Sequence, residues 1–182
     1  MATRTIATKL AIDGEKEYKS AIKTVNSELG ALKSELKLVE SQFSGQANSY
    51  AALEAKGKVL ASMYEAQEEK LSTLKEALKG AEGAQQGYGK QVEEAKKYVA
   101  ECEEALAALG DEAGDTSERQ KELEDELKKA NSELQKATLY QDEATRKCNS
   151  YRSQINQAET ALNQLSDEIA DNNRYLEEAE NN

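Results

Sequence analysis

Two cysteines are the residues of this sequence best suited to nucleophilic or metal chemistry. Cys102 and Cys148 lie far apart in the chain, with no Cys-x-x-Cys pair, and the sequence contains no histidine. A zinc site needs Cys or His ligands at short spacings, and a reactive thiol needs a neighbouring base. The spacing therefore predicts neither a zinc site nor a disulfide framework, but two thiols packed as small apolar side chains in a reducing compartment.

Adjacent glutamates are the other groups that could do chemistry, as acid and base. Neighbouring residues on a helix point about 100° apart, so these carboxylates do not converge on one substrate. The Gly-rich stretch 80–89 lacks the lysine and the preceding strand of a phosphate-binding loop. We expect no enzyme, no metal ligand and no cofactor. The acidic pairs are Glu93–Glu94, Glu103–Glu104 and Glu177–Glu178.

Composition indicates helices as the elements that carry these residues. The 182 residues include no Pro and no Trp, are 38% apolar and 5% aromatic, and are rich in Ala, Glu, Lys and Leu. This mixture favours an all-α fold without a thick core. Residues 80–182 carry 24 acidic and 12 basic groups, which disfavours specific nucleic-acid binding. No apolar run reaches the length of a signal peptide or of a membrane span.

One heptad frame runs through the chain, with Ile22 at position a and Tyr18 at the preceding position d. Of its 47 a and d positions, here called the seam, 39 are apolar. A straight helix drifts by about 20° per heptad against this repeat, so the pattern predicts a left-handed coiled coil. The seam residues that we expect to pack are Tyr18, Ile22, Val25, Leu29, Leu32, Leu36, Val39, Phe43, Leu71, Leu74, Leu78, Leu106, Leu109, Leu123, Leu127, Leu134, Ile155, Leu162, Leu165, Ile169 and Leu176.

Three stretches could interrupt this helix: 44–48, 80–89 and 110–117. A loop releases the heptad phase, and the frame is preserved across all three stretches. We therefore expect a continuous rod, about 240 Å long at 1.5 Å per residue. The alternative is helices folded back as hairpins at 80–89 or 110–117, with Thr116 or Ser117 as the N-cap of the last helix.

The pattern suggests three regions: an N-terminal arm (residues 1–14), a first coiled-coil region (15–109, weak at 80–89) and an acidic coiled-coil region (110–182). The seam predicts a homo-oligomer, such as a trimer, with parallel and antiparallel pairing both open. Polar seam residues such as Gln67, Gln85 and Asn172 either fix the register of pairing or mark marginal packing.

The arm reads differently from the rest of the chain. Ile6, Leu10 and Ile12 fall on one side of an extended segment, and Asp13 or Gly14 is placed to cap the following helix. A lone strand-like segment leaves its backbone groups unpaired. We therefore interpret the arm as a docking segment for a partner or a sister chain, with a disordered N-terminus as the alternative.

The beginning of the chain resembles tail tape measure proteins of long-tailed phages and prophages of Gram-positive bacteria. The similarity spans residues 6 to about 60 and lies in the segments IATKLAIDGEKEYKSAI (6–22), NSEL (26–29) and LKSELKL (32–38). Beyond residue 60 only heptad composition is shared. Full tape measure proteins are several-fold longer, so we expect an N-terminal fragment or a truncated gene.

The resemblance implies a helical ruler in the lumen of the phage tail, around which tail-tube subunits polymerise. It further implies contacts with tail assembly chaperones and tail-tip proteins, and residence in the bacterial host cytoplasm during assembly and in the virion tail afterwards. Any lytic or membrane-penetrating activity of longer members is not carried over. Periodicity alone leaves a second hypothesis open, a cellular coiled-coil spacer or tether.

Overall fold

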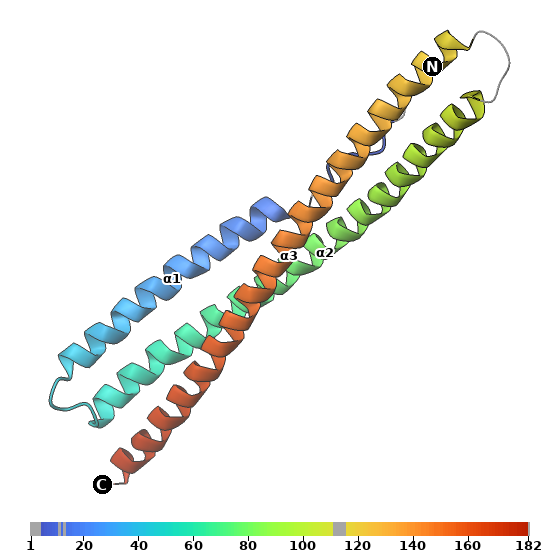
Figure 1. The fold of residues 1–182 in the computed structure, drawn as a ribbon. Helices are drawn as coiled ribbons and strands as arrows, with labels where there is room; N and C mark the ends of the chain where they lie inside the picture. The colour runs from blue at the N-terminus through green and yellow to red at the C-terminus, as the bar shows by residue number, and fades with distance from the viewer. Residues whose placement is uncertain (1–4, 11, 13, 111–115, 182) are drawn as a thin grey trace. The chain divides into compact units, whose positions relative to one another are not determined.

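Three α-helices account for most of the chain (Figure 1). The computed structural model describes residues 5–10, 12, 14–110 and 116–181. The helices are α1 (Glu15–Gln42), α2 (Tyr50–Gly110) and α3 (Ser117–Glu180), and none of the described residues forms a β-strand. The predicted all-α class is therefore confirmed, and the described residues of the arm form no strand.

The continuous rod is wrong, because the helix stops twice. The first interruption is the loop 43–49, which contains the predicted turn 44–48, and the second separates Gly110 from Ser117. Gly45 adopts a φ of 83°, in the left-handed region that favours glycine. At 1.5 Å per residue, the 61-residue α2 and the 64-residue α3 are about 92 and 96 Å long. A preserved heptad frame thus did not require a continuous helix.

The ends of the helices follow ordinary capping chemistry. Gly14 precedes α1 with a φ of 74°, and Glu15 and Glu17 lie in the first turn, where the helix dipole favours negative charge. Ser49 is the N-cap of α2: its hydroxyl accepts a hydrogen bond from the Ala52 amide at 3.3 Å. Of the two predicted caps for α1, Gly14 holds the position and Asp13 lies outside the described residues.

The Gly-rich stretch 80–89 is helical, so the hairpin predicted there does not form. Each helical Gly costs about 0.8–1.0 kcal/mol relative to Ala. Packing offsets that cost, because Ala81, Ala84 and Tyr88 are buried within the same stretch. At the other predicted hairpin, α2 ends at Gly110 and α3 begins at Ser117, and residues 111–115 lie outside the described part of the chain.

Contacts divide the chain into two compact units. Unit 1 combines residues 1–13 with 79–149, and unit 2 combines residues 14–78 with 150–182. Both units therefore take segments of α2 and α3, and each adds one segment from the start of the chain. This division cuts across the linear ranges 1–14, 15–109 and 110–182 that the sequence suggests.

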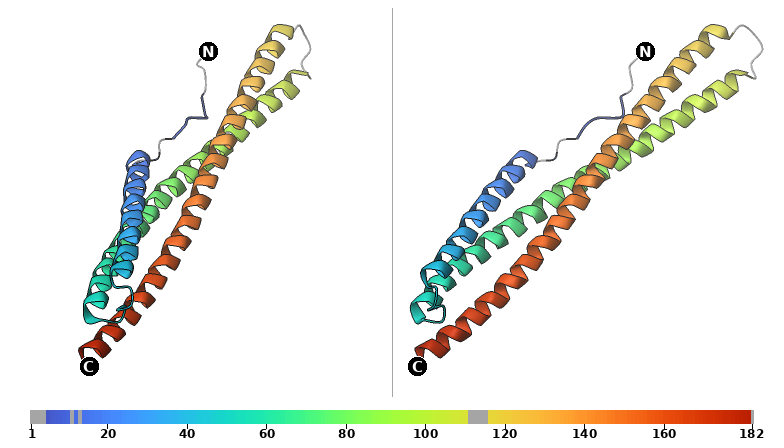
Figure 2. Two further views of the ribbon diagram at one scale, coloured as in Figure 1. Left: turned by 90° about the vertical axis from the view of Figure 1, so that its left-hand side faces the viewer. Right: turned by 60° about the vertical axis from the view of Figure 1, so that its left-hand side comes forward.

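Unit 2 is a three-helix arrangement in which α2 runs antiparallel to both α1 and α3 (Figure 2). Gln67 Nε2 donates to the Ala158 carbonyl (3.4 Å), and further back along α2 the Leu53 carbonyl accepts from Asn172 Nδ2 (3.0 Å). On a second face of α2, Val59, Met63 and Ala66 are buried with residues of α1 close by. Those three residues lie off the seam, so α2 carries two apolar faces. The α1 residues packed there are Val25, Leu29, Leu32, Leu36 and Val39.

Unit 1 is an antiparallel pair of helix segments with the arm packed on it. Gln85 Nε2 of α2 donates to Thr145 Oγ1 of α3 at 2.8 Å, while Val92 lies in one cluster with Ala137. Three alanines at successive d positions of α3 are nearly inaccessible to solvent, at 0–2% exposure. Small side chains at this spacing let the two helices approach closely. These alanines are Ala130, Ala137 and Ala144.

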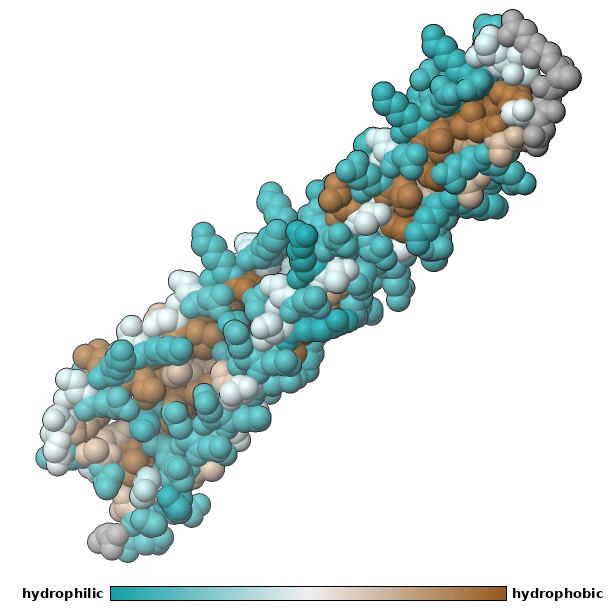
Figure 3. All heavy atoms as spheres, viewed as in Figure 1, coloured by the Kyte–Doolittle hydropathy of each residue, from teal (hydrophilic) through white to brown (hydrophobic). Residues whose placement is uncertain are grey.

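The seam residues named from the sequence lie toward the interior of the two units, and none of them is exposed. By contrast, the off-seam Leu38 and Leu139 are 56% and 59% exposed. On the face shown in Figure 3, apolar atoms form tracts bordered by hydrophilic side chains. The buried seam residues are Val25, Leu29, Leu74, Leu123, Ile155 and Leu165. The half-buried ones are Tyr18, Ile22, Leu32, Leu36, Val39, Phe43, Leu71, Leu78, Leu106, Leu109, Leu127, Leu134, Leu162, Ile169 and Leu176.

Candidate functional site

The candidate site is the surface of unit 1 that holds the arm. We call it the docking surface and define it by Gly87, Tyr88 and Gln91 of α2 and Glu133 and Ala137 of α3. Each of these residues contacts the arm directly or lies in a cluster with an arm residue. Residues 5–10 of the arm lie along it as a drawn-out segment (Figure 2).

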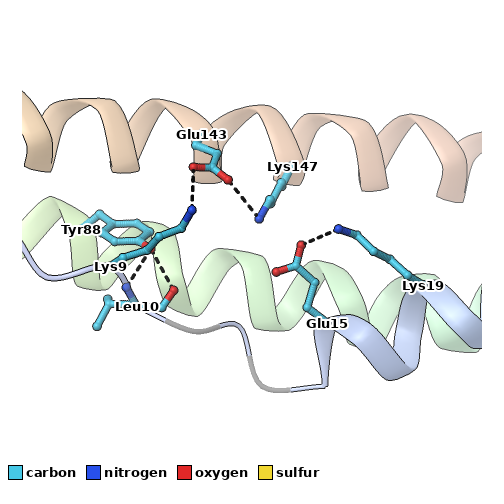
Figure 4. A network of polar contacts seen from close by, with 7 residues as sticks. All are labelled: Lys9, Leu10, Glu15, Lys19, Tyr88, Glu143 and Lys147. Carbon is cyan, nitrogen blue, oxygen red and sulfur yellow. Dashed lines mark hydrogen bonds and ion pairs between the residues drawn. The ribbon is translucent and has the colours of Figure 1, made fainter.

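Side chains of α2 bind the arm backbone much as a neighbouring β-strand would. The Thr8 amide donates to Gln91 Oε1 (2.8 Å), and Gln91 Nε2 donates to the Thr8 carbonyl (2.9 Å). Two residues further on, the Tyr88 hydroxyl accepts from the Leu10 amide and donates to the Leu10 carbonyl, both at 2.9 Å (Figure 4). In an extended chain, residues i and i+2 present their backbone groups to the same side. Two side chains on successive turns of α2 therefore satisfy the unpaired edge of the arm.

Glu133 of α3 binds the beginning of the arm. Its Oε2 accepts from the Ala7 amide (2.8 Å) and from the Ile6 amide (3.2 Å), and its side chain is only 12% exposed. Burial on its own raises the pKa of this carboxyl group. The hydrogen bond from Ala7, the contacts with Lys136 and the hydrogen bond from Ile6 outweigh burial and lower the pKa below its ordinary value. The carboxylate is therefore the form that holds the arm.

Apolar contacts fix the side chains of the arm. Ile6 and Ala7 are buried at 7% and 9% exposure, and Ala7 packs with Val92 and Ala137. Leu10 and Ile12 are half-buried against a second cluster, formed by Ala84, Tyr88 and Ala144. Of the predicted docking residues, Leu10 and Ile12 thus pack against unit 1 of their own chain, and Ile6 is buried and bound there through its backbone amide.

Gly87 makes room for Leu10. A Cβ atom at position 87 would lie 2.4 Å from Leu10 Cδ1, which no side chain tolerates without a shift. Four residues earlier on the same helix, Gly83 has no atom within 4 Å of the corresponding point. One of the glycines in the stretch 80–89 is therefore matched to the arm, which explains a Gly inside a packed helix.

An ion-pair chain lies beside the docked arm but is solvent-exposed. Lys9 Nζ lies 3.6 Å from Glu143 Oε2, and Lys147 Nζ lies 3.4 Å from Glu143 Oε1 (Figure 4). Side chains exposed to this degree contribute little through such pairs. Figure 4 also shows the Glu15–Lys19 pair of α1, which spans one helical turn at 3.0 Å within unit 2. The docking energy therefore comes mainly from the backbone hydrogen bonds and from Ile6, Ala7 and Leu10.

Sequence reasoning identified the arm but not what it binds. Gln91 and Glu133 are ordinary surface residues in the heptad frame, and nothing in their spacing distinguishes them from other Gln and Glu residues. Tyr88 was visible only as a seam aromatic. The one available signal was Gly87 beside Tyr88, because a small residue next to an aromatic residue on a helix allows another segment to approach closely.

The polar seam residues of unit 2 make specific contacts. The buried Gln67 and Asn172 each donate to a backbone carbonyl of the facing helix. Asn172 Oδ1 is buried without a hydrogen-bond partner, and Asn172 lines a cavity of about 320 Å³. This cavity also includes Phe43, Leu53 and Tyr175 in its wall. Donation to one particular carbonyl favours a single register of the helix pair.

The two cysteines and the adjacent glutamate pairs are not among the residues that define the docking surface. The described part of the chain holds no group of three or more Cys, Asp or Glu side chains that could bind a metal ion. Both cysteines are buried and do not form a disulfide with each other, and Cys148 Sγ lies 3.9 Å from Gln85 Oε1. None of the described helices is long and apolar enough to cross a membrane.

Comparisons with protein-family models, with curated proteins and with solved structures find no match to this chain.

Proposed function

We propose that this chain is a non-enzymatic structural protein, the N-terminal part of a phage tail tape measure protein that acts as a helical ruler and scaffold in the tail lumen. The resemblance of residues 6 to about 60 is the starting point. Tail-tube, tail assembly chaperone and tail-tip proteins are its proposed partners, with the host cytoplasm and then the virion tail as its locations.

One structural observation carries the proposal. Every d position of α2 from Leu53 to Cys102, and every d position of α3 from Leu123 to Asn172, is buried. The same frame includes Val25 and Leu29, the two buried residues of α1. A folded-back chain does not require one frame on both sides of its loops, whereas an extended coiled coil does. The shared frame therefore supports the proposal that these helices can give up their packing within one chain and pair with other copies in an extended coiled coil.

This proposal assigns the folded-back helices to the chain before assembly. The tail tube then imposes the extended form, in which length is proportional to the number of residues. The proposal also includes a homo-oligomer in the tube. The contacts described above are made within one chain, and in the extended form the same seam positions would pair between chains.

The decisive experiment changes the length of the ruler. The chain, within its full-length gene, is expressed with the tail proteins encoded beside it, and two heptads (residues 123–136) are deleted. At 1.5 Å per residue, tails measured by electron microscopy are expected to shorten by about 21 Å. A matched control deletes the arm, residues 1–13, which lies outside the heptad frame.

Two results would overturn the ruler. One is an unchanged tail length after the heptad deletion, with the shortened protein present in the tails. The other is a set of neighbouring genes without tail proteins, combined with no retention of the chain by an immobilised tail assembly chaperone. Either result favours the cellular spacer or tether.

A further inference from the structure

The arm is bound in one unit and covalently continued in the other. Its contacts are with the α2 and α3 segments of unit 1, whereas residues 14–78, which include α1, belong to unit 2. Four residues, 11–14, join Leu10 to the start of α1. All the bonds that hold residues 6–10 are therefore independent of the helix that follows them in sequence.

The docking surface binds atoms that every copy of the chain presents identically. Six hydrogen bonds join it to the backbone of Ile6, Ala7, Thr8 and Leu10. Leu10 fits over the bare backbone of Gly87. An arm from a second copy offers the same backbone groups and the same Leu10 side chain, so each of these contacts can be made between two chains at no loss.

The connection between arm and α1 is suited to such an exchange. It is short, and it contains Gly14 at a φ of 74°, a position where a glycine changes backbone conformation at low cost. Exchange of an identical element through a short hinge costs little beyond the entropy of association.

We propose that the docking surface is a self-recognition site, at which the arm of one copy binds unit 1 of a second copy. The partner is thus another molecule of this chain, and the recognised element is its extended segment 6–10. This inference rests on the contacts of unit 1 and not on a role in phage tails.

Two complementary variants test the exchange. The first, Gly87→Leu, keeps its arm but carries a side chain where Leu10 must lie. The second lacks residues 1–13 but keeps an intact docking surface. Each variant alone is expected to sediment as a single chain, because neither can supply both halves of the contact. Their equimolar mixture is expected to form a complex of one copy of each in analytical ultracentrifugation.

Matched variants separate exchange from other causes of association. Adding Leu10→Asp to the first variant is expected to weaken the complex at least tenfold. Replacing Gly87→Leu by Gly83→Leu leaves the docking surface open, since nothing lies near position 83. That chain is expected to close on its own arm and to bind the arm-deleted chain more weakly than the Gly87→Leu variant does.

Circular dichroism first shows whether Gly87→Leu keeps its helices. If it does not, the double variant Tyr88→Phe and Gln91→Ala takes its place, because it removes the four hydrogen bonds to Thr8 and Leu10. Single-chain masses in the mixture at high concentration would overturn the proposal. A complex that is not weakened by Leu10→Asp would also overturn it. The same holds if the arm-deleted chain binds a synthetic peptide of residues 1–13 but does not bind the arm of another copy.

Discussion

Replacing Gly87 by Ala tests the fit between the arm and α2 with a single methyl group. The new Cβ atom would lie 2.4 Å from Leu10 Cδ1, so Leu10 has to leave its position. Cδ1 is the far end of a flexible side chain, and the expected response is therefore withdrawal of Leu10 with the helix left intact. Gly83 is the matched control, because no atom lies within 4 Å of its added Cβ.

The two substitutions have the same effect on the helix and different effects on the arm. Ala in place of a helical Gly stabilises the helix by about 0.8–1.0 kcal/mol. Burying a leucine completely stabilises by about 1.5–3 kcal/mol, so displacing the half-buried Leu10 costs about 1 kcal/mol. Gly83→Ala is therefore expected to raise the free energy of unfolding of unit 1 by about 1 kcal/mol, and Gly87→Ala to leave it nearly unchanged.

Hydrogen exchange of the α2 amides between residues 84 and 99 measures this free energy in unit 1 itself. The same pair of substitutions is then made in a chain without residues 1–13, where Gly87→Ala is expected to stabilise as much as Gly83→Ala does. The difference between the two backgrounds isolates the coupling between Gly87 and the arm. Equal stabilisation by both substitutions in the intact chain would refute the reasoning, because Leu10 would then not depend on the missing side chain.

Three further perturbations probe other contacts. The pKa of Glu133 is lowered, so its contribution to arm docking is complete above the unfolded pKa of about 4.3 and is lost as the pH falls through the folded value. In a pH titration, the Ala7 amide resonance is expected to follow this loss. In Glu133→Gln the same resonance is expected to show no such transition. Asn172→Leu removes a buried oxygen without a partner and is expected to stabilise unit 2 by about 1 kcal/mol in urea denaturation; destabilisation would mean that the amide contributes more through Leu53 than its unpaired oxygen costs. Burial, and secondarily the positive charge of Lys33, lowers the pKa of Lys70. Lys33→Glu is therefore expected to stabilise unit 2 by up to about 0.5 kcal/mol at low salt and by less at high salt. A stabilisation that persists at high salt would show that the effect does not come from charge.

The heptad frame predicted the helices and their inward faces, because the spacing of apolar residues along a helix can be read from the local sequence. It placed Leu74, Leu123 and Leu165 toward the interior and left Leu38 and Leu139 outside, as the structure has them. The frame could not predict the direction of the chain after each break. Seam positions look the same whether they pair within one chain or between chains, so a preserved frame is compatible with hairpins as well as with the rod that it favours.

The missing information was a second apolar face rather than the seam. Val59, Met63 and Ala66 lie off the frame at helical spacing, and they are the residues that bring α1 onto α2. Treating them as background to the seam concealed the three-helix arrangement of unit 2. The docking surface was hidden for another reason: Gln91 and Glu133 bind backbone atoms, and such contacts leave no pattern of residue types in the sequence.

In each unit a further element covers apolar surface of the α2–α3 pair, and this element differs between the two units. In both, the seam faces of α2 and α3 pack against each other, and a further apolar strip remains to be covered. In unit 2 that strip carries Val59 and Met63, and α1 covers it with leucines and valines. In unit 1 the buried seam positions of α3 are mostly alanines, which bury little apolar area, and the additional cover is the arm.

Because so little other apolar surface is available there, Ile6 and Leu10 supply a larger share of the core of unit 1 than their number suggests. An extended segment is also thinner than a helix, so it can lie on the alanine- and glycine-rich stretch of α2 where side chains are short. The off-seam face of α2, bulky at Val59 and Met63 and bare at Gly87, therefore differs between the part that α1 covers and the part that the arm covers. The arm is accordingly part of the folded structure of unit 1, and its removal is expected to increase amide exchange in α2 around Tyr88 while leaving residues 53–67 of unit 2 unchanged.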